Sequence, residues 1–192
     1  MNNLKYKQSA QGAYYHLYNR GNQKKDIFLD EKDYEFYLRK MTEASKKYSF
    51  AIISYCLMPN HIHLIVRQDK EYPPAKFISS VHTSYAAVFN KKYKTVGHLF
   101  QDRFKQKIIE NDDYMRNLIA YVHLNPVKAG ICNFPKEYKW SSHMEYAKTG
   151  IIKDSDGLCD RGLIEEYGMK GETFEEFVTM AGNISKEDAF DD

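Results

Sequence analysis

The feature that most constrains the fold is a short stretch, residues 58–66, in which two histidines stand two positions apart among Ile, Leu and Val residues. Side chains of a β-strand alternate between the two faces of a sheet, so a strand here would turn His61 and His63 one way and Ile62 and Leu64 the other. Because a slip of one residue would exchange the faces, burial of the apolar set fixes the direction of both imidazoles. Two neutral imidazoles on one face are half of a metal site, although a pair of surface histidines satisfies the same pattern.

Length and composition favour one main domain of a soluble protein. The chain has 192 residues, of which 43% are hydrophobic, enough for one substantial core. Its three cysteines are an odd number without a C-x-x-C pair, which argues against a disulfide framework and against a cysteine-ligated zinc. No stretch approaches the roughly 18 apolar residues of a membrane span, and the first residues lack the apolar region of a signal peptide. We therefore expect a cytoplasmic protein with no membrane partner.

Charge divides the chain into two parts. Residues 151–192 hold 4 Lys and Arg against 12 Asp and Glu, whereas residues 1–150 hold 24 against 14. The balances are thus −8 and +10, and we expect a basic main domain at 1–150 with an acidic C-terminal extension at 151–192 of unassigned role. A basic domain favours a polyanionic partner, although a charge excess of this size is also compatible with an ordinary solvated surface.

Hydrophobic periodicity and turn signals predict strands at residues 14–21, 50–57 and 61–66 and in the second half of 97–109, and helices at residues 30–48, 75–93 and 114–125. Short helices are expected after Ser141 or Ser142 and, in the extension, at 162–167 and 173–180. The order is that of an α+β fold of the ferredoxin-like or RRM-like type, with helices packed on one antiparallel sheet and a small, mostly helical extension. The histidine strand would then be central.

Two helices carry more specific predictions. The helix at 75–93 should place Val88 on its buried stripe, and the helix at 114–125 should stop at Pro126. On the second helix Tyr121 and Asn125 lie one turn apart on one face, so they could supply a nucleophile and a further ligand beside a metal. The plainer interpretations are an edge-of-core tyrosine, one of 16 in the chain, and a helix-capping asparagine. His123 should face away from Tyr121, so we assign no general base.

Cations recur at alternate positions of the last predicted strand. Arg103, Lys105 and Lys107 would share one face, which suits contacts to phosphate groups, although a solvated strand face is the alternative. The remaining candidates for phosphate contacts are Arg20, Lys91, Lys92 and Lys94.

Four motifs together resemble the REP-associated tyrosine transposases of the HUH superfamily. They are Met-Pro-Asn-His-Ile-His at 58–63, the stretch Gly-His-Leu-Phe-Gln-Asp-Arg-Phe-Lys at 97–105, Tyr-Val-His-Leu-Asn-Pro-Val-Lys-Ala-Gly at 121–130 and Tyr-Lys-Trp-Ser-Ser at 138–142. The resemblance spans about residues 13–147. It implies that His61 and His63 are metal ligands, that Tyr121 is the nucleophile and that Asn125 is a third ligand.

The resemblance also implies an activity. Such an enzyme uses Mg²⁺ or Mn²⁺ to cleave and rejoin single-stranded, hairpin-forming DNA through a 5′-phosphotyrosine, as a monomer or a homodimer. The seven candidate cations then become DNA-binding residues.

Two other classes of function stay open at this level. An RRM-like module would bind single-stranded nucleic acid on Tyr14, Tyr15 and Tyr18 without catalysis. A zinc hydrolase could use the histidine pair, but the sequence around it lacks the glutamate base of an H-E-x-x-H motif. The remaining histidines considered, namely His16, His82, His98 and His143, are interpreted as structural or surface residues.

Overall fold

A four-stranded antiparallel sheet forms the centre of the computed structural model, which describes residues 10–147, 157–168 and 171–181. Its strands are β1 (Tyr14–Arg20), β2 (Phe50–Met58), β3 (His61–Gln68) and β4 (Lys105–Ile109), in the spatial order β2-β3-β1-β4. The histidine strand β3 is central, between β2 and β1. The predicted ferredoxin-like α+β fold is confirmed.

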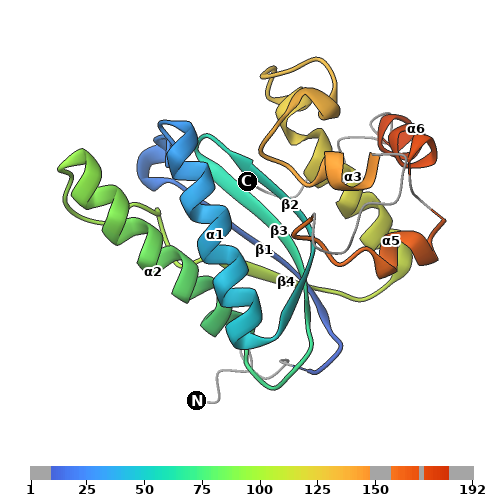
Figure 1. Cartoon of the computed structure of the whole chain (residues 1–192), viewed down its shortest axis with the longest axis horizontal. Coiled ribbons are helices and arrows are strands. Elements are labelled where there is room, and N and C mark those ends of the chain that lie inside the picture. The colour runs from blue at the N-terminus through green and yellow to red at the C-terminus, as the bar shows by residue number, and fades with distance from the viewer. Residues whose placement is uncertain (1–9, 148–156, 169–170, 182–192) are drawn as a thin grey trace.

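Helices α1 (Glu31–Tyr48) and α2 (Pro74–Tyr93) cover one face of the sheet, as Figure 1 shows. The apolar residues of β3 that alternate with the histidines point into this layer and pack with Leu17, Tyr37 and Phe77, all fully buried. Val88 is an exception to the predicted stripe of α2, because it lies at the margin of the helix face and is 41% exposed.

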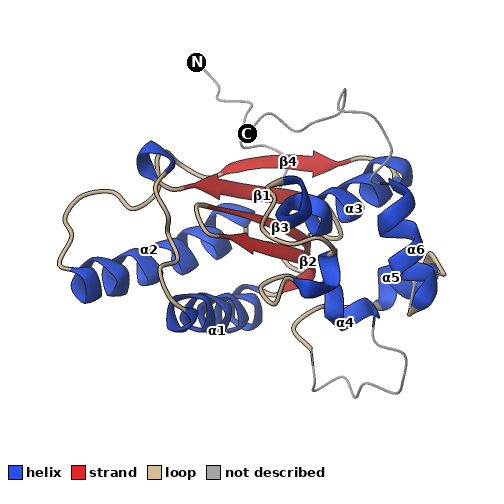
Figure 2. Cartoon of the chain, turned by 90° about the horizontal axis from the view of Figure 1, so that it is seen from above, coloured by secondary structure: helices blue, strands red, loops and turns tan. Residues whose placement is uncertain are grey.

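The opposite face carries α3 (Asp112–Lys128) and the later helices α4 (His143–Ala147), α5 (Gly162–Glu166) and α6 (Glu172–Ala181) (Figure 2). Two single turns of 3-10 helix, η2 (Asn22–Lys24) and η3 (Pro135–Glu137), lie in the connections. Helix α3 packs mainly on β2 and reaches β3, so it covers one half of this face. Among the described helices, none combines the length and apolar character needed to cross a bilayer.

Helix α3 does not stop at Pro126, as the sequence led us to expect, but runs two residues further to Lys128. A proline lacks the backbone N–H and so removes one hydrogen bond of the helix. Near the end of a helix this loss is small, because only the last turn follows it. The carbonyls of this turn accept from residues beyond the helix, including the Ala129 N–H to Asn125 O and the Ile131 N–H to Pro126 O, both at 2.9 Å. Asn125 is therefore inside the helix.

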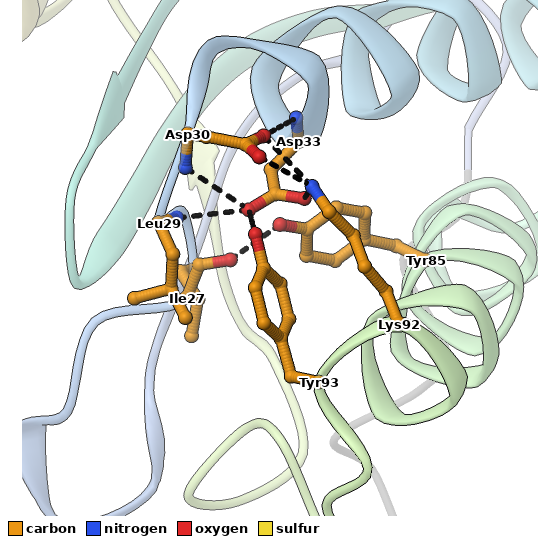
Figure 3. A network of polar contacts seen from close by, with 7 residues as sticks. All are labelled: Ile27, Leu29, Asp30, Asp33, Tyr85, Lys92 and Tyr93. Atoms are coloured by element: carbon orange, nitrogen blue, oxygen red, sulfur yellow. Dashed lines mark hydrogen bonds and ion pairs between the residues drawn. The ribbon is translucent and has the colours of Figure 1, made fainter.

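A carboxylate network joins the start of α1 to the end of α2 (Figure 3). Asp30 and Asp33 cap the first turn of α1 reciprocally. Lys92 Nζ lies 2.7 Å from Asp33 and 2.8 Å from Asp30, and the Tyr93 hydroxyl donates to Asp33 at 2.8 Å. Because Asp33 is only 4% exposed, its charge depends on these partners.

Strand β2 forms one edge of the sheet, and later parts of the chain cover its backbone. The Leu57 N–H donates to Trp140 O at 2.9 Å, and the Ser142 N–H donates to Tyr55 O at 3.0 Å. The Asp160 N–H, from the acidic extension, donates to Ile52 O at 2.7 Å. This edge therefore has partners along much of its length.

The described part of the extension also enters the core, with helices close to the predicted positions. Ile164, Phe174 and Val178 are fully buried against α3 and its neighbours. The Phe174 ring lies 5.4 Å from the His123 ring and 5.2 Å from the Tyr146 ring, measured between centroids. The extension thus contributes to the layer that holds α3 in place.

Replacing Phe174 by alanine should lower the free energy of unfolding by about 3–5 kcal/mol, the usual cost of deleting a buried phenylalanine. The matched control is Met180→Ala on the same helix, because Met180 is 72% exposed and should change stability by less than ~0.5 kcal/mol. Urea unfolding followed by circular dichroism measures both variants. Equal stabilities would mean that α6 does not belong to the folded core.

Acid should destabilise the protein partly through His123. This histidine is fully buried, and burial keeps its pKa well below the usual value of about 6.5. Below pH ~6.5 the unfolded chain binds a proton on His123, whereas the folded chain does not. The free energy of unfolding is therefore unaffected by His123 above that pH and falls below it. Between pH 6.5 and 5.5 the share of His123 is ~1 kcal/mol. His123→Gln should lose less stability over this range in urea titrations than wild type. Parallel curves for wild type and His123→Gln would contradict the assignment.

Candidate active site

The two histidines of β3 lie on the face of the sheet that α3 partly covers. His61 is half-buried at the start of the strand, and His63 is fully buried. Their ring centroids are 5.1 Å apart with perpendicular planes. The intervening Ile62 packs in the opposite core, so the predicted alternation of faces is present.

Each histidine has its Nδ1 atom engaged by a neighbour. His61 Nδ1 lies 2.6 Å from Asn60 Oδ1, and His63 Nδ1 lies 3.0 Å from His16 Nε2. Burial, followed by the charges of His16, His61 and Arg20, keeps the pKa of His63 well below the usual range. Burial lowers the pKa of His16 to about 3, with a further contribution from Lys107. His63 and His16 are therefore neutral near pH 7, and neutral imidazole is the form that binds metals.

Tyr121, from the middle of α3, brings a phenol ring to this pair. Its centroid lies 5.5 Å from that of His63, and the planes are perpendicular. Lys128 Nζ lies 5.2 Å from the centre of the Tyr121 ring, so a cation accompanies the phenol. Two residues along the helix, His123 points elsewhere: its Nε2 is 2.8 Å from Ser142 Oγ and 3.2 Å from Ser54 Oγ. No base for Tyr121 comes from His123.

Asn125 follows Tyr121 by one helical turn and is 7% exposed. Its side-chain Nδ2 donates to the carbonyl of Tyr121 at 3.0 Å. The amide nitrogen is thus used within the helix, and the assignment of Asn125 as a third ligand stays a prediction.

A pocket of about 300 Å³ opens over the histidines where β1 ends and β3 begins. Its wall includes His61 and His63 and four cationic residues, namely Arg20, Lys24, Arg103 and Lys105. Arg20 is thereby placed beside the histidines, and Lys24 is a basic residue of this pocket that the sequence reading did not single out. The chemistry of the wall suits a phosphate group.

The predicted row of cations on the last strand is present only in part. Lys105 and Lys107 lie opposite Tyr18 and His16 in the register of β1 and β4 and share the face of the histidines. Arg103 does not lie in the strand, contrary to expectation. Gly21 already forms a bridge with Phe100, so four residues, 101–104, stand against only two of β1, and the extra residues bulge from the sheet.

The three lysines at the end of α2 lie in the helix layer across the sheet from Tyr121. Lys91 and Lys94 are exposed. Lys92 forms ion pairs with Asp30 and Asp33. It therefore helps to join α2 to α1, a role that the sequence analysis did not predict.

Sequence reasoning missed His16 by treating it as structural or surface, although it contacts His63 directly. Strand alternation was the available signal, since it puts His16 on one face with Tyr18, whose ring stacks on it at 4.7 Å. The same alternation shows that Tyr14, Tyr15 and Tyr18 cannot all belong to one stacking surface for nucleic acid. Tyr15 is 2% exposed in the α1–α2 core, and Tyr14 and Tyr18 lie on the other face.

A metal ion at this site would need donor atoms from the protein, from water and from the substrate. Across the described ranges, no group of three or more His, Cys, Asp and Glu side chains is arranged to hold a metal. Two imidazoles leave most coordination positions to water, an amide oxygen and phosphate oxygens. Mg²⁺ commonly keeps several waters and takes few protein ligands beside the phosphate of its substrate, although those protein ligands are usually carboxylates rather than imidazoles. Two imidazoles beside a phosphate site leave room for such an ion, and the assignment of His61 and His63 as its ligands stays a prediction.

Comparisons with known proteins give the chain a family. A protein of Haemophilus influenzae named as a REP-associated tyrosine transposase is 29% identical over 138 residues, which cover 63% of this chain and 77% of that protein. The solved structure of a REP-associated tyrosine transposase bound to a REP hairpin superposes with a TM-score of 0.61 at 17% identity, covering 82% of this chain and 97% of that one. This structural similarity supports the α+β fold described above. The model of the family described as "Transposase IS200 like" matches residues 9–125. The chain therefore belongs to the IS200-like transposase family, whose members are tyrosine transposases that cleave and join DNA.

Proposed function

We propose that this transposase is metal-dependent and cleaves single-stranded DNA at hairpin-associated sites through a 5′-phosphotyrosyl intermediate on Tyr121. The observation that carries the proposal is the contact between Tyr121 and His63, whose ring centroids are 5.5 Å apart. A nucleophile and an imidazole ligand side by side allow one phosphate group to meet both.

In the proposed step, the phenolate oxygen of Tyr121 attacks the phosphorus and forms a new O–P bond. The bond from phosphorus to the 3′ oxygen of the preceding nucleotide breaks, and that oxygen takes up a proton. The phosphotyrosyl bond keeps the energy of the original phosphodiester. A 3′-hydroxyl of another strand can therefore reverse the step and join DNA without ATP.

Tyrosine must ionise before it attacks, and its reference pKa is ~10. Lys128 places a cation beside this ring, with its ammonium 5.2 Å from the ring centre. His123 is engaged with Ser54 and Ser142, so it is not proposed as the base.

His61 and His63 would hold Mg²⁺ or Mn²⁺, with Asn125 as the proposed third ligand. When bound, such an ion neutralises charge on the non-bridging oxygens and orients the phosphate. The part of the protein is to hold both rings in place through their Nδ1 partners, and burial also keeps His63 neutral.

The proposed DNA path runs over the histidine pocket, whose cations match a phosphate backbone. Lys105 and Lys107 extend this positive surface along β4. A hairpin substrate is supported by the solved structure of a similar protein, which was bound to a REP hairpin. A single strand suits the site because a scissile strand within a duplex would first have to be unpaired.

Tyr121→Phe should abolish the covalent adduct while leaving DNA binding intact, because it deletes the attacking oxygen and keeps the ring that packs on His63. The assay incubates the full chain and Mn²⁺ with a labelled single-stranded hairpin from beside its own gene, followed by a denaturing gel. Peptide mapping by mass spectrometry should find the 5′-phosphate on Tyr121. The same gel with chelator in place of Mn²⁺ tests the metal requirement.

The matched control is Tyr114→Phe on the same helix, two turns earlier, which should form the adduct at the wild-type level. Attachment to Tyr114 or Tyr138, or efficient cleavage by Tyr121→Phe, would refute Tyr121 as the nucleophile. Cleavage at the wild-type rate in chelator would refute the metal dependence alone.

Replacing Arg103, Lys105 and Lys107 together by glutamine should weaken DNA binding and flatten its salt dependence. At ~0.7 per phosphate contact on single strands, three lost contacts reduce the slope of log K against log salt by about two units. Fluorescence anisotropy at several salt concentrations measures this slope. The control triple Lys32, Lys46 and Lys47→Gln changes the net charge equally on α1, across the sheet, and should leave the slope unchanged. Equal slopes for both triples would reduce the three cations to a solvated surface.

A further inference from the structure

His16 is a buried side chain to which neither the family motifs nor the proposed chemistry gives a role. It is fully buried in β1, and its Nε2 lies 3.0 Å from His63 Nδ1. Its ring is nearly parallel to that of His63, with centroids 5.3 Å apart, and stacks on the ring of Tyr18 at 4.7 Å. Burial and stacking together fix the ring beside His63.

Register explains why these two histidines meet. Tyr18 lies directly opposite His63 in the antiparallel pair of β1 and β3, and His16 lies opposite Ile65. His16 is thus the diagonal neighbour of His63 on the same face, within reach of a long side chain. The contact is set by backbone pairing in the centre of the sheet.

The chemistry of two neutral imidazoles restricts this hydrogen bond. Each ring has one N–H donor and one lone pair, so one ring must donate and the other must accept. If His63 binds a metal through Nε2, the proton of His63 is on Nδ1 and His16 is the acceptor. Metal-bound histidines characteristically donate their second N–H to a partner that orients the ring.

His61 provides a parallel within the same site. Its Nδ1 lies 2.6 Å from Asn60 Oδ1, while Asn60 Nδ2 donates to the carbonyl of Lys24 at 3.2 Å. Since only the amide nitrogen can donate to that carbonyl, the amide oxygen faces His61 and accepts from it. His61 is therefore protonated on Nδ1, which leaves the lone pair of the ring on Nε2.

We propose that His16 is a positioning residue that accepts the Nδ1–H of His63 and so holds His63 in the tautomer and orientation that ligate the ion through Nε2. The proposal rests on the proposed function, in which His63 is a metal ligand. Asn60 and His16 would then act alike, each through a different histidine of the pair.

The test compares His16→Leu, which removes the acceptor, with His16→Gln, which keeps an acceptor oxygen. Mn²⁺ binding without DNA is measured by electron paramagnetic resonance titration of the full chain. His16→Leu should bind Mn²⁺ 10–100-fold more weakly than wild type, and His16→Gln should stay within a few-fold. The matched control is His123→Leu, another buried histidine whose loss leaves the Mn²⁺ affinity unchanged. Wild-type affinity in His16→Leu, or equal losses in both His16 variants, would overturn the proposal.

A second readout does not depend on metal. Nitrogen-15 NMR of histidine side chains in the metal-free wild type should find His63 protonated on Nδ1. A proton on His63 Nε2 would overturn the assignment of His16 as acceptor. If wild type bound no Mn²⁺, the metal part of the proposed function would fail, and the NMR spectrum would still decide the direction of the His16–His63 bond.

Discussion

Alternation along β3, fixed by pairing on both sides, is the constraint on which the rest of the structure depends. Ile62, Leu64 and Val66 are all fully buried in the α1–α2 core. A shift of one residue would turn the histidines into that apolar layer, where polar groups without hydrogen-bond partners cost several kcal/mol. The chemistry of the site thus depends on hydrophobic burial on the opposite face.

The start of β3 is held by a separate set of contacts. Gly21 N–H donates to Asn60 O at 2.8 Å, and Ile27 N–H donates to Pro59 O at 2.7 Å, so the loop after β1 holds the turn before His61. Gly21 is required there, since a Cβ would lie 2.0 Å from the carbonyl oxygen of Lys25. Tyr85 of α2 donates to the Ile27 carbonyl, which connects this loop to the network of Figure 3. The helix layer across the sheet therefore helps to set the position of His61.

Local pattern was enough to predict much of this protein. A period of two on a strand gave the direction of His61 and His63, and a period near 3.6 put Tyr121 and Asn125 on one face of α3. The features that the sequence analysis did not predict depend on contacts between segments far apart in the chain. His16 becomes part of the site only because β1 pairs with β3, and Lys92 is an ion-pair partner only because α1 and α2 meet.

The same reason accounts for Arg103 and for the extension. The bulge that removes Arg103 from the strand depends on where Phe100 pairs with Gly21, a choice that no periodicity within residues 97–109 encodes. Likewise, charge counting left the acidic extension at 151–192 without a role, and only the folded contacts show that Phe174 is fully buried beside His123. Net charge carries information about partners and solubility but none about which apolar side chains of a segment reach a core.

The covering of the β2 edge has a consequence for how the protein behaves when it is damaged. Asp160 provides one of the backbone hydrogen bonds that close this edge, at Ile52. Proteolytic loss of the segment that carries Asp160 would bare part of a strand rich in Ile, Tyr and Leu, with its carbonyls directed outward. Such an edge is a template for strands of other molecules. A clipped protein would then be prone to sheet-to-sheet aggregation even where its catalytic groups were intact.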